Sequence, residues 1–573
     1  MSTQDQHGTR RSHPRRPRSH TARLVAAAGA AALTFSAGLA TPLNPAPQRA
    51  EAAQGKKTLT VAVAQSVDSL SPFLAVRLVS TSILRLTYEY LTDYDPGDAH
   101  PVPGLATAWQ PSPDKLTWTY TIRSDAKWSD GQKVTADDVA YTFTLIKGNE
   151  ALNQFAIPYD GITVNGNVVH VTFKSPQFVN QNKIMANTPI VPKHIWEKIA
   201  DPATDINKNP IGSGPYTLKS FTQAGVVLTV RDSGYWQDLP KVKELRYTSY
   251  ADNSAQTTAL ANGESEWSFV FIPNYQATFI SKDPQNHKIW APGVLGIHGL
   301  YINTTIKPFD DAKLRQAMNM VINRADIFHQ AEAGYFHPQI DSVTGLPAGA
   351  GDAFVAPEYK GKTMTPDVEG AKALLAKSGY RLNGTTLTDP AGKPVKITLT
   401  DPAPWSDYQT TLEILKTNFA QIGIDATVDK ANQDKWDQNV QKGDFGATMR
   451  WTNGGATPYD IYQTVMDGDL LKPIGTAAQQ GNFGRFKSPE ATAALKAYAN
   501  ATSDAERTTA MNQIQKVFVE QAPMLPVGSD NVGGAYSTKN WIGWPSDADP
   551  YAGMQPTQPY ALDVVLHLKP ANS

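Results

Sequence analysis

The fold is decided by three strand-like stretches, "VKITL" (395–399), "IDATV" (424–428) and "FGATMRW" (445–451), with a helical stretch between each pair. The helical stretches carry apolar residues at helical spacing: Leu412, Leu415, Phe419 and Ile422 in the first, Trp436 and Val440 in the second. Strands that alternate with helices form βαβ units, so an α/β fold is predicted. Ligands of such sheets bind beyond the carboxyl ends of the strands. Trp451 and the loop that contains Trp405 lie at such ends, which predicts a binding site there.

Further helices are predicted around this run, between residues 298 and 520. One of them has a single apolar face made of Leu314, Ala317, Met318, Val321 and Ile322. Thr365 and Pro366 are interpreted as the N-cap and first-turn proline of a second helix. Ser503 and Glu506 have the spacing of a capping box at the start of a third. This half of the chain is therefore predicted to be a separate α/β lobe.

The part of the chain before residue 298 is richer in strands. Alternating or β-branched stretches occur at "LTWTYTIR" (116–123), "NVVHVTF" (167–173) and "VVLTV" (226–230). Glycine and proline clusters such as "NPIGSGPY" (209–216) separate them as turns. With 573 residues the chain is long enough for two or three domains.

Residues 1–52 have the composition of a signal peptide. Six arginines precede an uncharged, alanine-rich run from residue 24 to residue 40, which is too short and too weakly apolar to span a membrane. Ala50 and Ala52 supply small residues for cleavage, so an exported protein is expected. Arg10 and Arg11 leave open whether the general or the twin-arginine export route is used.

Composition excludes several kinds of protein. The chain has no cysteine, so disulfides and a cysteine-linked lipid anchor are both excluded. Removing the signal peptide takes away 7 of 52 basic and 2 of 53 acidic residues, which leaves a net charge of about −6. This charge does not favour a nucleic-acid partner.

Motifs for chemistry are weak. "APEYKGKT" (356–363) matches a relaxed phosphate-loop pattern, but Pro357 and Pro366 disrupt the strand and helix that this mechanism needs. His194 and Glu197 have metal-like spacing without a third ligand. We therefore expect no cofactor, no metal and no catalytic residue, although a secreted hydrolase such as a glycosidase or peptidase stays open.

Six blocks of sequence occur in a familiar order. They are "PIGSGPYTLKSF" (210–221), "YWQDLPKVKELRY" (235–247), "LANGESEWSFV" (260–270), "NTTIKPFDDAKLRQAMNMVINR" (303–324), "DVEGAKALLAKSGY" (367–380) and "NFGRFKSPEATAAL" (482–495). Together they resemble the family 5 extracellular solute-binding proteins of ABC importers, the group that binds dipeptides, oligopeptides and nickel. The resemblance implies a two-lobed Venus-flytrap fold that closes on a solute and delivers it to a membrane permease, without itself catalysing a reaction.

The resemblance also implies a domain plan. Lobe I would comprise 54–102, 210–297 and 521–573, with a β-rich domain inserted at 103–209, and lobe II would comprise 298–520. The chain would cross between the lobes near 297–303 and near 520–528. We expect a monomer that works at the membrane through its permease, in the periplasm or outside the cell.

The solute depends on what surrounds Trp451. Peptide-binding members of the family commonly carry an aspartate three residues after this tryptophan, which pairs with the peptide ammonium. Here Gly454 stands at that position, and the nearest substitutes are the uncharged Asn453 and the distant Asp460. The expected ligand-binding residues are Trp451, Asn453, Trp405, Tyr459 and Trp436.

The missing aspartate slightly favours a β-linked oligosaccharide over a peptide. Aromatic faces and amides suit sugar rings and hydroxyls. The segment 536–552, with Trp541 and Trp544, also resembles the tail of family members that bind such oligosaccharides. A strict peptide-binding protein stays the alternative, and nickel is disfavoured because no histidine cluster is evident.

Overall fold

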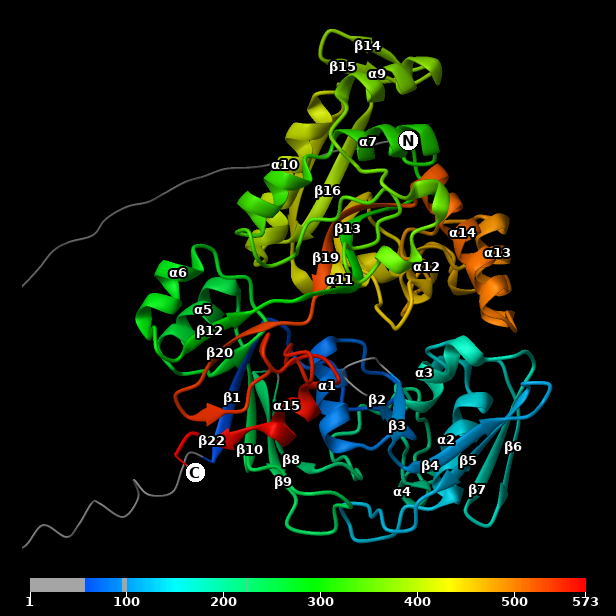
Figure 1. Ribbon diagram of the computed structural model, residues 1–573, viewed down its shortest axis with the longest axis vertical. Helices are drawn as coiled ribbons and strands as arrows, with labels where there is room; N and C mark the ends of the chain where they lie inside the picture. Colours follow the sequence, from blue (N-terminus) through cyan, green and yellow to red (C-terminus); the bar gives the residue numbers. More distant parts are fainter. Residues whose placement is uncertain (1–56, 95–99, 223, 573) are drawn as a thin grey trace, which may run out of the picture. The chain divides into compact units, whose positions relative to one another are not determined.

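The computed structural model describes residues 57–94, 100–222 and 224–572 (Figure 1). The predicted signal peptide, 1–52, lies outside the described residues. Within the described ranges, no helix combines the length and the apolar character that crossing a membrane requires. The described residues belong to one compact unit, which contains two large sheets and a smaller one.

A five-stranded sheet is built around the predicted βαβαβ run, in the order β17-β16-β18-β13-β19. Its strands are β17 (Asp425–Ala431), β16 (Lys396–Pro402), β18 (Ala447–Trp451), β13 (Gly293–Ile302) and β19 (Met524–Asn531). The first three are parallel, whereas β13 pairs antiparallel with both β18 and β19. The crossover helices are α10 (Ser406–Ala420) and α11 (Gln433–Lys442). The predicted α/β fold is confirmed, and we call this sheet and its helices the five-stranded lobe.

Most of the other helices of this lobe begin at a residue whose side chain accepts a backbone N–H. They include α7 (Ala312–Val321), α8 (Arg324–Asp326), α9 (Val368–Lys377), α12 (Tyr459–Met466), α13 (Pro489–Asn500) and α14 (Asp504–Gln521). The capping box of α14 is confirmed, since the Glu506 N–H donates to Ser503 Oγ and the Ser503 N–H donates to Glu506 Oε2. The predicted start of α9 at Thr365 is wrong. Asp367 caps this helix instead, because its carboxylate accepts the Gly370 N–H at 2.8 Å.

A seven-stranded sheet forms the second lobe, in the order β12-β20-β11-β1-β10-β9-β8. Its strands are β1 (Thr58–Val63), β8 (Tyr216–Thr222), β9 (Gly225–Val230), β10 (Glu244–Ser249), β11 (Trp267–Ser268), β12 (His287–Trp290) and β20 (Gly534–Ser537). Its helices include α1 (Leu78–Thr87), α5 (Asn253–Ala261), α6 (Tyr275–Thr278) and α15 (Ala561–His567). Trp541 and Trp544 are buried in the core of this seven-stranded lobe. Their side chains serve packing there, and the resemblance of the tail to oligosaccharide-binding members stays a prediction.

A four-stranded antiparallel sheet completes the β-rich segment, in the order β4-β5-β7-β6. Its strands are β4 (Ala106–Pro111), β5 (Thr117–Ile122), β6 (Tyr159–Asn165) and β7 (Val168–Phe173), with α2 (Ala136–Gly148), α3 (Gln181–Met185) and α4 (Lys193–Trp196) beside them. Leu84 of α1 and Tyr88, which follows this helix, belong to the same hydrophobic core. Three two-stranded sheets complete the strands: β2 (Thr92–Tyr94) with β3 (Pro101–Pro103), β14 (Arg381–Asn383) with β15 (Thr386–Thr388), and β21 (Trp541–Ile542) with β22 (Lys569–Pro570).

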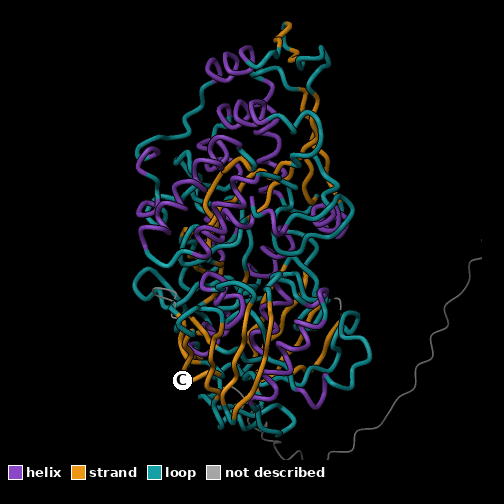
Figure 2. The backbone as a smooth tube through the Cα atoms, turned by 90° about the vertical axis from the view of Figure 1, so that its right-hand side faces the viewer, coloured by secondary structure: helices purple, strands orange, loops and turns teal. Residues whose placement is uncertain are grey.

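The chain passes between the two large sheets at two places. β12 ends at Trp290 and β13 begins at Gly293, while β19 ends at Asn531 and β20 begins at Gly534. These passages lie a few residues outside the predicted crossings, because β13 and β19 pair with each other over their whole length. In the view turned by 90°, strands occur in both the upper and the lower part of the backbone (Figure 2). The exact lobe boundaries stay a prediction.

Gly299 in the middle of β13 permits a close approach to β19. A Cβ atom added there would lie 2.5 Å from the Leu525 carbonyl oxygen, which is rigid backbone. We expect Gly299→Ala to lower the free energy of unfolding by about 2 kcal/mol or more, measured by urea denaturation. Gly148→Ala is the matched control, because its Cβ would meet nothing within 4 Å and the change should stay within about 1 kcal/mol. Equal stability of the two variants would contradict this account.

Candidate ligand-binding cleft

Two cavities lie between the lobes, and Trp451 lines both of them. The first cavity has a volume of about 260 Å³ and the second about 120 Å³. Gln65 and Gln558 from the seven-stranded lobe line both cavities as well. The two cavities are therefore neighbouring parts of one cleft at the end of β18.

The buried carboxylate of Asp401 fixes the ends of β16 and β18 to each other. It accepts hydrogen bonds from Thr448 Oγ1 at 2.8 Å and from the Met449 N–H at 3.1 Å. Trp436 Nε1 in turn donates to Thr448 Oγ1 at 2.7 Å, so α11 joins the same network. Burial raises the pKa of Asp401 well above its usual value, although its hydrogen bonds act in the opposite direction.

This network holds three predicted residues in one aromatic cluster. The Trp405 ring lies 5.2 Å from the Trp436 ring and 6.5 Å from the Trp451 ring, measured between centroids. Tyr408 meets Trp405 edge to face at 5.0 Å. Trp436 and Trp451 line the first cavity, and Trp405 and Trp451 line the second. The structure therefore brings Trp405, Trp436 and Trp451 together at the cleft.

The other two predicted residues lie differently. Asn453 lines the first cavity and donates from Nδ2 to the Gln480 carbonyl at 3.4 Å. Tyr459 is buried on α12, where its ring stacks on Tyr498 at 5.1 Å, and it lines neither cavity.

Two acidic side chains that the sequence analysis did not name line the cleft. Asp460, the substitute considered above, lies 3.4 Å from Lys183 of α3 and lines neither cavity. Asp407 at the start of α10 and Asp530 at the end of β19 both line the second cavity, beside Trp451. The signal for Asp407 was present in its position just after a strand end. Asp530 gave no such signal, since its strand is remote in sequence.

Both acids of the second cavity lack a charged partner in the described part of the chain, since His337, whose Nε2 lies 4.0 Å from Asp530 Oδ1, is neutral. Burial, and to a smaller extent the nearby Glu332, raise the pKa of Asp407 to about 7. Burial likewise raises the pKa of Asp530 to about 7. Asp407 Oδ1 accepts from Asn253 Nδ2 of the other lobe at 3.2 Å. Among the described residues, neither acid forms an ion pair with a lysine or arginine.

Arg450 is a further residue that the sequence reasoning missed. It directly precedes Trp451 and lines the first cavity, with its guanidinium 4.8 Å from the Trp451 ring centroid. Two acids therefore line the second cavity, whereas the arginines Arg77, Arg85 and Arg450 and one aspartate, Asp437, line the first.

One histidine cluster borders the second cavity and was not evident from the sequence. Ligand atoms of His298, Glu332 and His337 lie within 4.8 Å of one another, the only such set of potential metal ligands among the described residues. However, the two imidazole rings stack face to face at 3.9 Å, while the lone pairs of ring nitrogens lie in the ring planes. Burial lowers the pKa of His337 to about 3, so the pair is neutral. A metal would have to separate the two stacked rings.

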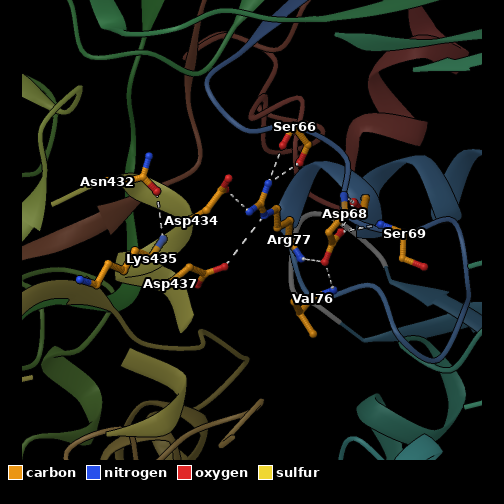
Figure 3. Close-up of polar contacts among 10 residues, drawn as sticks. Ser66, Asp68, Ser69, Val76, Arg77, Asn432, Asp434, Lys435 and Asp437 are labelled. Carbon is orange, nitrogen blue, oxygen red and sulfur yellow. Dashed lines mark hydrogen bonds and ion pairs between the residues drawn. The ribbon is translucent and has the colours of Figure 1, made fainter. Parts of the chain in front are cut away.

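An ion pair joins the lobes at the edge of the first cavity (Figure 3). Arg77 Nη2 lies 2.5 Å from Asp434 Oδ1, and Arg77 Nε lies 3.9 Å from Asp437 Oδ2. Arg77 Nη1 also donates to Ser66 Oγ at 2.6 Å, which holds the guanidinium in the direction of α11. This contact connects the residue before α1 of the seven-stranded lobe with a helix of the five-stranded lobe.

Two lobes around a cleft with aromatic walls and opposite charges define a solute-binding protein. The sequence profile "Bacterial extracellular solute-binding proteins, family 5 Middle" matches residues 100–469, so the chain belongs to this family. The predicted membership and the predicted two-lobed fold are confirmed. The chain is thus a solute-binding receptor of an ABC importer, of the kind that captures peptides or oligosaccharides.

Known relatives cover nearly the whole described chain. The glutathione-binding protein GsiB of Salmonella typhimurium is 26% identical over 499 residues, which cover 85% of this chain and 92% of GsiB. The oligopeptide-binding protein OppA of Bacillus subtilis is 25% identical over 501 residues, 83% of this chain and 88% of OppA. A mannohexaose-bound periplasmic oligopeptide-binding protein of Thermotoga maritima is similar in structure, with a TM-score of 0.81, 24% identity, and coverage of 90% and 98%.

Removing the Asp401 acceptors should loosen the aromatic cluster. We expect Asp401→Leu to cost about 1–3 kcal/mol of unfolding free energy, because the buried Met449 N–H loses its acceptor. Asp401→Asn should cost less, since its amide oxygen still accepts one hydrogen bond. Urea denaturation followed by tryptophan fluorescence measures both effects. An Asp401→Leu variant as stable as the parent protein would contradict the proposed role.

Breaking the ion pair between the lobes should weaken ligand binding modestly. Exposed ion pairs contribute about 0.2–1 kcal/mol, so Arg77→Gln is expected to lower affinity by about two- to fivefold. Asp434→Asn should give a similar loss, and the double variant should lose no more than either single variant. Titration calorimetry at low and high salt tests this. Additive losses in the double variant would show that the two residues act independently.

Proposed function

We propose that this receptor captures a short peptide with a free amino terminus and holds the peptide ammonium between Asp407 and Asp530. The observation that carries this proposal is the pair of carboxylates in the second cavity, Asp407 buried and Asp530 27% exposed, which lack a lysine or arginine partner among the described residues. Burying a carboxylate without a counter-charge is costly, and an ammonium supplies both the charge and three hydrogen-bond donors. The two acids thus offer what Gly454 does not offer after Trp451.

The relatives support a peptide. GsiB is named for binding glutathione and OppA for binding oligopeptides. The aromatic side chains of the second cavity, among them Phe269, Phe271 and Phe336, suit the apolar side chain of a first peptide residue.

A neutral oligosaccharide is the second candidate, and the first cavity favours it. Seven amide side chains line this cavity together with two tryptophans: Gln65, Gln154, Asn187, Asn453, Gln479, Gln480 and Gln558, with Trp436 and Trp451. Amides and indole faces are the groups that sugars need. The related fold of the Thermotoga maritima protein accommodates mannohexaose.

We further propose that the protein is exported, acts as a monomer next to its permease and catalyses no reaction. Membership of a family of binding proteins supports this over a secreted hydrolase. Trp451, Trp405, Trp436 and Asn453 are the proposed ligand contacts of the cleft, whereas Tyr459 is assigned to packing around α12.

Thermal unfolding in the presence of candidate ligands tests the proposal. A panel of di- to pentapeptides and of cello-, manno- and xylo-oligosaccharides is compared at equal concentrations. A true ligand at a hundred times its Kd should stabilise the protein by about 2.7 kcal/mol. Stabilisation by sugars alone would overturn the peptide proposal, and unchanged affinity in Trp451→Ala would overturn the site.

Peptide affinity should rise with pH. Raised pKa values near 7 mean that both acids are largely neutral at pH 5.5 and largely ionised at pH 8. Affinity for a peptide with a free ammonium should therefore increase over this range, until the amine itself deprotonates near pH 8. The free energy of unfolding of the ligand-free protein should instead decrease over the same pH range. Each raised pKa stabilises the fold fully below about pH 4, and this contribution is lost as the pH rises through about 7.

Titration calorimetry between pH 5.5 and pH 8 measures this effect. An N-acetylated peptide is the ligand control, and the Asp407→Asn/Asp530→Asn double variant is the protein control. Both controls should flatten the pH profile. A profile that is equally steep for the acetylated peptide would mean that the two acids do not bind the ammonium.

A further inference from the structure

Arg450 lines the first cavity, and two of its hydrogen-bond donors lack an acceptor among the described residues. Its Nε and Nη1 atoms are buried and have no hydrogen-bond partner among the described residues. Three aromatic rings surround the guanidinium instead, with centroids at 4.2 Å (Phe483), 4.8 Å (Trp451) and 5.7 Å (Trp436). These rings hold the cation in place through cation–π contacts.

Aromatic rings alone do not satisfy a guanidinium. They attract its charge, but its N–H groups lie in the guanidinium plane and need acceptors there. The nearest acid that attracts Arg450 is Asp437, which lies 3.9 Å from Arg77 and forms no ion pair with Arg450. Burial lowers the pKa of Arg450, in keeping with a charge that is incompletely compensated, although arginine stays protonated.

We propose that Arg450 is the anion-binding residue of the cleft and that the solute presents a carboxylate to it. A carboxylate offers two acceptor oxygens in the spacing that a guanidinium fork pairs with best. This proposal rests on the proposed function only in placing the solute in this cleft. A peptide carboxyl terminus, an acidic peptide side chain and the uronic acid of an acidic oligosaccharide all supply the same group.

For a peptide, Arg450 fixes the direction of binding. Asp407 and Asp530 line the second cavity, Arg450 lines the first, and Trp451 lines both. A peptide whose ammonium lies in the second cavity would cross the Trp451 ring and extend its carboxylate toward Arg450. Reversal would place like charges together at both ends, which is unfavourable.

Paired ligands that differ only in the carboxylate test the proposal. Titration calorimetry compares a short peptide with its C-terminal amide, and a uronic-acid oligosaccharide with its neutral counterpart. For the class of ligand that binds, we expect the parent protein to prefer the acid at least tenfold. Arg450→Gln should abolish this preference, and Arg450→Lys should keep part of it, since a lysine retains the charge without the fork. Arg246→Gln, which changes an exposed arginine of β10, is the control and should retain the full preference.

The outcomes separate this inference from the proposed function. Peptides that bind equally well as acid and amide would overturn the role of Arg450 and leave the peptide proposal intact. Binding of uronic-acid oligosaccharides alone, with a preference that Arg450→Gln abolishes, would support Arg450 and overturn the peptide proposal. A full acid preference retained in Arg450→Gln would overturn the role of Arg450. Thermal unfolding without ligand checks that each variant is folded. If Arg450→Gln does not fold, Arg450→Lys provides the test.

Discussion

The cleft depends on one buried carboxylate. Asp401 at the end of β16 accepts hydrogen bonds from Thr448 and from the Met449 backbone of β18, and Thr448 accepts from the indole of Trp436. Because these bonds join two strands and a helix at one point, the side chains that follow at the strand ends are held in fixed positions. Trp405, Trp436 and Trp451 form one aromatic surface for this reason, and Arg450 packs against it.

Charge is separated along this surface. Two carboxylates without a lysine or arginine partner among the described residues line the second cavity, and the first is lined by Arg450, two of whose nitrogens lack an acceptor. Leaving such groups uncompensated costs stability, which fits a site that completes its pairings with a ligand. The Arg77 ion pair joins the lobes at the edge of the first cavity. A contact between the lobes therefore lies next to the proposed binding site.

The sequence correctly predicted those features that depend on residue spacing within a single segment. The βαβαβ run and the capping box at Ser503 follow from residue spacing within a single segment, and both are present. The start of α9 was misplaced because Asp367 competes with Thr365 for the same role, and spacing alone does not rank the two. Tyr459 was expected at the cleft from its nearness to Trp451 in sequence, whereas the geometry of α12 turns it onto Tyr498.

By itself, the sequence determined the α/β class, the family, and the edge of the sheet where the tryptophans gather, because periodicity and strand ends are properties of short segments. Only the tertiary structure decided the charges of the cleft. Asp407 and Asp530 are 123 residues apart and belong to a helix and an antiparallel strand, which meet only once the sheet has formed. Arg450 was visible beside Trp451 from the start, but its unpartnered nitrogens are a consequence of packing. The absence of an aspartate after Trp451 was therefore not enough to predict which charged groups line the cleft.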